Sequence, residues 1–221
     1  INRETATIAL SYCDRFLLGK KISRHRYQIV AITCLFIASK LFEKRPIKMT
    51  ALMDYTQGKF DRNEVVSMEE DVATSIGSYM YPPTASTFVL MLLNEFSCTS
   101  SFQLTLLESC QFMIELATCD FFFLAHKQSK LAVASIIVAM EQMDVEMSSD
   151  LIRACLSTIN IKPVIDISDD SETTACIEQL RKIYSHNEKR IKSIDGSNNN
   201  GTTTVDQRTE QCDRKRICRA A

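Results

Sequence analysis

Residues 29–38 of this 221-residue chain read Ile-Val-Ala-Ile-Thr-Cys-Leu-Phe-Ile-Ala, and Lys40 follows two positions later. A helix through this segment is apolar on every side, which is typical of a helix that other helices surround. It also contains small residues that would let those neighbours approach closely, namely Ala31, Cys34 and Ala38. The segment therefore predicts a bundle built around one buried helix.

Shorter-range patterns predict amphipathic helices on both sides of this segment. Residues 3–19 carry apolar side chains at every fourth position, and Gly19 marks the expected end of that helix. Ser23 is a favourable N-cap for the buried helix, which should run to about Phe42. A short helix is expected over 47–56, after the interruption at Pro46.

The next helix has the clearest sequence signals at both ends. Asp61 and Glu64 have the spacing of a capping box, in which each side chain satisfies a backbone N–H of the first turn. Gly77 stands where a C-cap glycine belongs, and Pro82-Pro83 forms a rigid stop. These signals predict a helix from Asp61 to about Ile76.

After the two prolines, the same order of elements begins again. We expect a helix capped by Thr84 through about Phe96, and then one capped by Ser100 or Ser101 through about Cys119. A second wholly apolar helix follows at 131–140. The last two are a short helix at 148–159 and a long amphipathic helix after the acidic stretch 166–172. Such duplication predicts an all-α fold of two tandem helical bundles. A single irregular all-α domain is the alternative. We predict domains at 1–83 and 84–192, followed by a disordered tail at 193–221 whose composition cannot form a core.

Composition excludes several classes of protein. The chain is 45% hydrophobic and 24% charged, with a net charge of −1, which is ordinary for a globular protein and argues against nucleic acid as a partner. No apolar run approaches the ~18 residues that a membrane span requires. Nine cysteines without any CxxC pair indicate free thiols in a reducing compartment, so we expect a nuclear and cytoplasmic location.

Nothing in the sequence indicates an enzyme. The three histidines, His25, His126 and His186, lie far apart and lack metal-ligand spacing. The five glycines cannot build a phosphate-binding loop, and no nucleophile or zinc-protease motif is present. We therefore expect no catalytic residue, no metal and no cofactor, and a function in protein–protein interaction.

Several motifs together resemble the cyclin box. They are Asp14-Arg15-Phe16-Leu17, Tyr27-Gln28, the run from Thr33 to Lys40, Glu43, Pro46, Met68-Glu69 and Pro82-Pro83-Thr84. The resemblance is specific over about 2–95 and looser over 96–185, where it implies a second, divergent cyclin fold. It also implies that the first helix of the first box lies upstream of Ile1.

The resemblance implies a non-catalytic subunit that binds and activates a cyclin-dependent serine/threonine kinase in cell-cycle control. Cyclins hold a mobile helix of the kinase inward, which positions its active site. By similarity, Lys40 and Glu69, which are 29 positions apart, would bond to each other and to the kinase backbone. The apolar floor beneath the kinase helix would consist of Leu41, Ala73 and Ile76.

Two further features follow from the same resemblance. Asp14 and Arg15 would form an internal ion pair or support a loop. Where the family often has a large apolar residue, this chain has Ser78, and Tyr79 or Met80 would have to compensate.

Two other functions fit a duplicated helical fold. A transcription-factor-IIB-like protein would bind promoter DNA through a basic groove, for which a net charge of −1 offers little support. A helical scaffold without a kinase partner is the third possibility.

Overall fold

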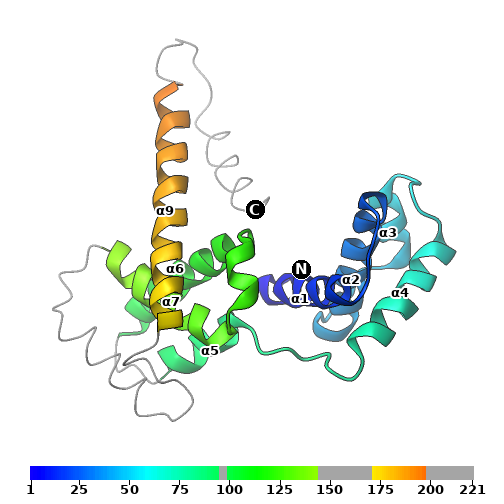
Figure 1. Cartoon of the computed structure of the whole chain (residues 1–221), viewed down its shortest axis with the longest axis horizontal. Helices are drawn as coiled ribbons and strands as arrows, with labels where there is room; N and C mark the ends of the chain where they lie inside the picture. The colour runs from blue at the N-terminus through cyan, green and yellow to red at the C-terminus, as the bar shows by residue number, and fades with distance from the viewer. Residues whose placement is uncertain (95–98, 144–170, 198–221) are drawn as a thin grey trace. The chain divides into compact units, whose positions relative to one another are not determined.

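The computed structural model describes residues 1–94, 99–143 and 171–197, and these residues form eight α-helices and two short 3-10 helices, with no β-strand (Figure 1). The chain divides into two compact units, Ile1–Thr84 (unit 1) and Ala85–Ala221 (unit 2). The all-α prediction is confirmed for the described part. None of the helices in these residues is both long and apolar enough to cross a membrane.

Unit 1 is built around one central helix, as the sequence predicts. Its elements are α1 (Arg3–Gly19), the 3-10 helix η1 (Arg24–Arg26), α2 (Tyr27–Phe42), α3 (Met49–Thr56) and α4 (Arg62–Ile76). Helix α2 packs against both α1 and α4, which also contact each other. The largest side chains that are completely buried in this unit come from all three helices: Tyr12, Phe16, Val30, Val65 and Val72.

Local signals set most of the helix ends in unit 1. The Asp61–Glu64 capping box is present in both directions, and Gly77 ends α4 with φ +58°, a conformation that favours glycine. The expectation for Ser23 was wrong in part. Ser23 precedes η1 rather than α2, and its carbonyl, not its hydroxyl, accepts the Arg26 N–H, so the 3-10 turn replaces a side-chain cap.

Unit 2 repeats the arrangement around α7 (Gln128–Gln142). Helix α7 packs against α5 (Ala85–Leu93), α6 (Ser100–Thr118) and α9 (Ser171–Ser197), and a 3-10 helix, η2 (Phe121–Ala125), links α6 to α7. The core joins apolar side chains from all four α-helices, among them Val89, Leu106, Ile136 and Leu180.

Three predicted boundaries in unit 2 differ from the structure. Helix α5 ends at Leu93 instead of near Phe96, and Thr99, rather than Ser100 or Ser101, is the N-cap residue of α6. Helix α9 continues through Ser193, where we expected the tail to begin. The polar composition there favoured a coil, but extending an existing helix adds a hydrogen bond for each residue fixed. The short helix predicted at 148–159 and the tail beyond Ser197 lie outside the described residues.

Candidate functional site

The centre of the candidate site is an ion pair that joins two helices of unit 1. Lys40 lies in the last turn of α2, and its Nζ is 2.5 Å from Oε1 of Glu69 on α4. The Lys40 ammonium also lies 4.0 Å from the centre of the Phe36 ring, within range of a cation–π contact. A cation in this position is favoured by the dipole of α2, whose negative end it occupies.

Both partners of this pair remain accessible to solvent. The exposed fractions of the Lys40 and Glu69 side chains are 42% and 25%. Pairs of this exposure typically stabilise a fold by ~1 kcal/mol or less. The pair therefore contributes little to the stability of unit 1, and its main effect is to fix the orientation of two charged groups at the surface.

The three residues predicted to form an apolar floor differ in accessibility. Leu41 is 38% exposed at the end of α2, and Ala73 is half-buried on α4. Ile76 is only 6% exposed and belongs to the core of unit 1. Its place on the Val65–Met68–Val72 stripe turns Ile76 inward, so little of its side chain is accessible, and its part in a floor for a partner stays a prediction.

The structure adds one apolar residue to this surface that the sequence analysis did not identify. Val66 on α4 is 39% exposed. It precedes Glu69 by three positions and Ala73 by seven, so the three residues share one face of the helix. Each of these residues directly follows a residue of the buried stripe on α4. The same helical spacing, applied from Val66 onward, predicts this second face from the sequence.

Arg15 and Tyr12 hold the chain that follows α4. Arg15 donates hydrogen bonds to the carbonyl oxygens of Ile76 (3.3 Å) and Tyr79 (2.8 Å), and its guanidinium lies 5.1 Å from the Tyr79 ring centre. The Tyr12 hydroxyl donates to the Met80 carbonyl, and burial raises the pKa of Tyr12 to about 12. The loop-support role expected for Arg15 is confirmed.

Asp14 does not share this role. In the part of the chain that the structure describes, no ion pair joins Asp14 to Arg15. The Asp14 carboxyl is half-buried, and this burial raises its pKa. Tyr79, which follows Ser78, is largely exposed. A large side chain is therefore present beside the position at which cyclins often have a large apolar residue and this chain has Ser78.

Glu43 anchors the beginning of α1 to the end of α2. Its Oε1 accepts hydrogen bonds from the Asn2 backbone N–H (2.6 Å) and the Thr5 hydroxyl (2.7 Å), and these bonds lower the pKa of the Glu43 carboxyl. Ser39 adds a second anchor, since its hydroxyl oxygen accepts the Ile47 N–H. The end of α2 that carries Lys40 is thus held from both neighbouring segments.

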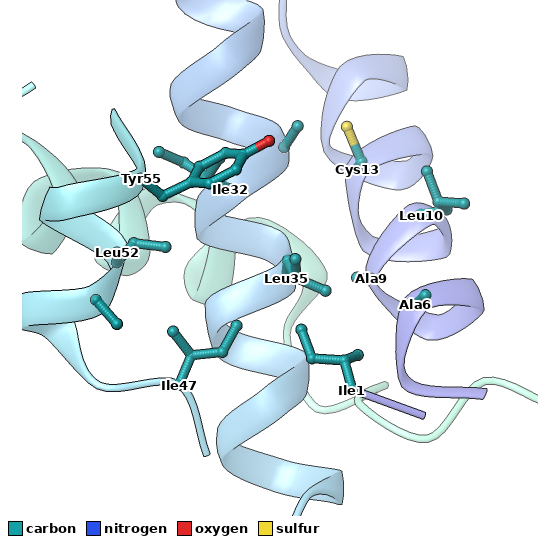
Figure 2. A pocket seen from close by; sticks show the side chains of 12 residues that line it. Ile1, Ala6, Ala9, Leu10, Cys13, Ile32, Leu35, Ile47, Leu52 and Tyr55 are labelled. Atoms are coloured by element: carbon teal, nitrogen blue, oxygen red, sulfur yellow. The ribbon is translucent and has the colours of Figure 1, made fainter. Parts of the chain in front are cut away.

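A separate feature of unit 1 is an apolar groove between α1, α2 and α3, with a volume of about 580 Å³ (Figure 2). Its walls include Ala9, Leu10, Cys13, Leu35, Leu52 and Tyr55. Ala31, which also lines the groove, precedes Lys40 by nine residues, which is about two and a half helical turns, so the two side chains point in opposite directions from the helix axis. The groove and the Lys40–Glu69 pair therefore lie on opposite sides of α2.

Comparison with known proteins identifies both units. The family model described as "Cyclin, N-terminal domain" matches residues 1–81, and "Cyclin, C-terminal domain" matches residues 83–200. The chain belongs to the cyclin family. This family consists of non-catalytic regulatory subunits. Among the residues that the structure describes, no group of three or more His, Cys, Asp or Glu side chains could hold a metal ion.

Curated relatives include two kinds of cyclin. The chain is 24% identical to G1/S-specific cyclin-D1 of Mus musculus over 180 residues, which cover 81% of this chain and 61% of the relative. It is 31% identical to cyclin-A3-3 of Arabidopsis thaliana over 139 residues, which cover 62% of this chain and 42% of the relative. The chain thus spans about three fifths or less of the length of these relatives.

A solved structure supports the fold. The structure matches the X-ray structure of a viral cyclin from herpesvirus saimiri with a TM-score of 0.63, over 84% of this chain and 86% of that chain. The sequence identity is 15%, so this likeness shows the fold alone.

Proposed function

We propose that this chain binds a cyclin-dependent serine/threonine protein kinase and activates it in the control of the cell cycle. The observation that carries the proposal is the Lys40–Glu69 ion pair on the outer surface of α2 and α4, in a chain that belongs to the cyclin family. The name of one relative, G1/S-specific cyclin-D1, refers to a step of the cell cycle.

The proposed site would act by holding the kinase's mobile regulatory helix in its inward position. That position brings a glutamate of the helix against the lysine that orients ATP, so the kinase active site is assembled. Leu41, Ala73 and Val66 supply accessible apolar surface at the end of α2 and on α4. Ile76 and Met68 support this surface from the core behind it.

The two charges have a different task from the apolar surface. The pair uses one N–H of the Lys40 ammonium and one oxygen of the Glu69 carboxylate. The other N–H groups of Lys40 and the second oxygen of Glu69 can therefore bond to a partner's backbone. Because the pair already exists in the free chain, a partner need not order the two side chains. We infer that it sets the register and orientation of the kinase helix.

Magnitudes support this division of roles. Shifting a kinase from 1:99 to 99:1 in favour of its active form needs about 5.5 kcal/mol of differential binding. A partly exposed ion pair supplies ~1 kcal/mol or less. Apolar contact over a large interface must provide most of the remainder.

The test measures binding and activation of recombinant cyclin-dependent kinases by the chain and by the variants Lys40→Ala and Glu69→Ala. We expect each variant to bind its kinase about tenfold more weakly, equivalent to ~1.4 kcal/mol, because it loses the proposed hydrogen bonds to the kinase backbone as well as the pair itself. Activation should fall correspondingly. The melting temperature should change little, because an exposed pair contributes little stability.

Lys20→Ala is the matched control. Lys20 also forms an exposed ion pair in unit 1, with Asp71 at 3.4 Å and side-chain exposures of 43% and 50%. This variant should bind and activate the kinase as the unaltered chain does. Unchanged activation by both Lys40→Ala and Glu69→Ala would remove the pair from the interface.

A DNA-binding function would give a different result. If no kinase in the panel binds, and the chain binds DNA with an affinity that falls steeply with salt, the promoter-binding alternative replaces the kinase proposal. A nuclear and cytoplasmic location belongs to the kinase proposal, and imaging of the tagged protein in its host cell would test it.

A further inference from the structure

Three exposed cations follow the end of α2 that carries Lys40. They are Lys44 and Arg45, in the bend after α2, and Lys48, which directly precedes α3. We call these three residues the basic corner. Arg45 follows Lys40 by five positions, and a chain spans at most ~3.6 Å per residue, so their Cα atoms lie within ~18 Å of each other. The basic corner therefore lies beside the end of α2 that bears the Lys40–Glu69 pair.

The positive charges of the basic corner are not neutralised within unit 1. Among the residues that the structure describes, none forms an ion pair with a side chain of this corner. Glu43 precedes the corner in the sequence, but its Oε1 is bonded to Asn2 and Thr5. The Glu69 carboxylate is paired with Lys40. The corner therefore presents its positive charge to solvent.

Hydrogen bonds on both sides hold the segment that carries Lys44 and Arg45. Before this segment, the Glu43 backbone N–H donates to the Ser39 carbonyl oxygen (3.1 Å). After it, the Ile47 backbone N–H donates to the Ser39 hydroxyl oxygen (3.2 Å). Because only three residues lie between these two anchors, a partner need not order the backbone that carries the two cations.

Helix stability does not account for these charges. A cation stabilises a helix within its last turn, but Lys44 and Arg45 lie beyond the end of α2. Lys48 is the N-cap residue of α3, where a positive charge opposes the helix dipole and where its side chain makes no capping hydrogen bond. Local arrangements that do not stabilise the fold are typical of functional surfaces.

We propose that the basic corner binds an acidic segment of the partner kinase, a group of Asp and Glu side chains that flanks the kinase's regulatory helix. The proposal rests on the kinase-binding function proposed above and adds a second part to the same interface. Lys40 and Glu69 set the register of the kinase helix, whereas the basic corner attracts the kinase before contact.

Distance selects the kinase as the source of the carboxylates. At physiological salt, exposed charges interact over about 8 Å. With the kinase helix at the Lys40–Glu69 pair, the groups within this range of the basic corner are those that flank the helix. A nucleic acid fits less well, because three cations neutralise about three phosphates, whereas tight DNA binding typically uses roughly 6–10 phosphate contacts.

Charges at the rim of an interface act mainly on the association rate. The double variant Lys44→Glu/Arg45→Glu reverses two of the three charges and replaces attraction by repulsion. We expect it to associate with the kinase about tenfold more slowly at about 50 mM salt, and at nearly the unaltered rate at about 1 M salt. Its dissociation rate and melting temperature should change little, because both side chains are exposed.

The test is stopped-flow measurement of the association and dissociation rates at both salt concentrations. The probe is the recombinant cyclin-dependent kinase that binds the unaltered chain, with its activation loop unphosphorylated, so that carboxylates supply the negative charge. Lys40→Ala, measured alongside, should mainly raise the dissociation rate, because it removes a contact made in the complex.

Lys21→Glu/Arg24→Glu is the matched control. Both residues are exposed and lie between α1 and α2, at the other end of α2. A helix of 16 residues is ~24 Å long, which is about three times the distance over which exposed charges interact. This variant has the same net charge as Lys44→Glu/Arg45→Glu but should keep the association rate of the unaltered chain.

A compensating change in the kinase identifies the acidic segment. Replacing the acidic residues that flank the regulatory helix with Lys should slow association with the unaltered chain. The same kinase variant should restore the association rate of Lys44→Glu/Arg45→Glu, because opposite charges then face each other again.

Three results would overturn the basic corner as a kinase contact. One is an association rate that the double variant leaves unchanged at low salt. Another is equal slowing by the control variant, which would show an effect of net charge alone. The third is slowing that occurs only with the phosphorylated kinase, which would assign the contact to a phosphate.

The same measurements separate this proposal from the proposed function. If Lys40→Ala and Glu69→Ala weaken kinase binding while Lys44→Glu/Arg45→Glu associates normally, the basic corner is excluded and the kinase function stands. If no kinase in the panel binds the chain, both proposals fall. DNA binding that the double variant abolishes would then assign the corner to nucleic acid.

Discussion

The two central helices, α2 and α7, have the same kind of sequence but different surroundings. In the apolar segment 131–140 of α7, every residue except Ile137 is buried. In the segment 29–38 of α2, Ala31 is exposed and Leu35 is half-buried, and both line the groove. The difference has a structural source. Helix α5 packs against α6 and α7, whereas none of the helices that the structure describes in unit 1 fills the groove.

This difference shows what a periodic pattern can and cannot predict. When a helix is apolar on every side, burial of any side stabilises the fold. The gain is about 25 cal/mol per Å² of apolar surface removed from water. The pattern does not state which element covers each side. Equal substitutions in α2 and α7 should therefore have unequal effects, and the following experiments use that inequality.

The largest expected difference comes from shortening one apolar side chain in each helix. Ile136→Ala should lower the free energy of unfolding of unit 2 by about 3 kcal/mol, because it leaves a cavity in a closely packed core. Leu35→Ala should cost unit 1 only about 1 kcal/mol, since Leu35 is already partly exposed to the groove. Urea unfolding combined with hydrogen exchange would assign each loss to its unit.

Equal losses at the two positions would contradict the comparison. They would show that the groove side of α2 is covered in solution as fully as α7 is. Val30→Ala provides the control within α2, because Val30 is completely buried in unit 1 and should resemble the core position rather than Leu35.

Enlarging a small residue tests the same contrast in the opposite direction. Ala134→Leu should destabilise unit 2 by about 2 kcal/mol, because Ala134 has no exposed surface and the larger side chain would force its neighbours apart. Ala31→Leu should change the stability of unit 1 by less than about 0.5 kcal/mol, since the added atoms can enter the groove. Thermal melting of both variants measures the effect, and a large loss from Ala31→Leu would mean that the groove has no free space.

Local sequence signals predicted much of the fold. The Asp61–Glu64 capping box, Gly77 and the stripe of apolar residues on α4 each depend on neighbours within one or two helical turns, so they can be read from the sequence. The prediction failed at Ser23, where a 3-10 turn replaces the side-chain cap, and at the end of α5, which comes earlier than expected.

The candidate site was predictable to a smaller extent. Family resemblance, rather than periodicity, identified Lys40 and Glu69 as a pair, and the structure places them in contact. The inward position of Ile76 followed from its core stripe and could have been recognised. The partners of Glu43 could not, because Asn2 and Thr5 lie about 40 residues away in the sequence and only the packing of α1 on α2 brings them together.

The smallest expected effect concerns a feature that the two units share. In unit 2, the Asp120 carboxylate accepts hydrogen bonds from the Phe122 N–H (2.9 Å) and the Gln179 side chain (2.7 Å), and these bonds lower its pKa, as the Asn2 and Thr5 bonds do for Glu43 in unit 1. A carboxyl whose pKa is lower in the folded state stabilises the fold above its ordinary pKa, and this stabilisation is lost as the pH falls through the lowered value.

Glu43→Gln and Asp120→Asn should therefore each lower the melting temperature slightly at neutral pH, and the difference from the unaltered chain should disappear as the pH falls through the lowered pKa of each carboxyl. Melting curves recorded across the acid range measure this, with Glu70→Gln, an exposed carboxylate on α4, as the control for removing one charge. The two units differ in how fully their central helices are covered, but this carboxylate anchoring does not depend on that coverage. If the melting temperature of either variant stays below that of the unaltered chain at low pH, the amide disturbs packing. The charge of the carboxylate is then not what stabilises that unit.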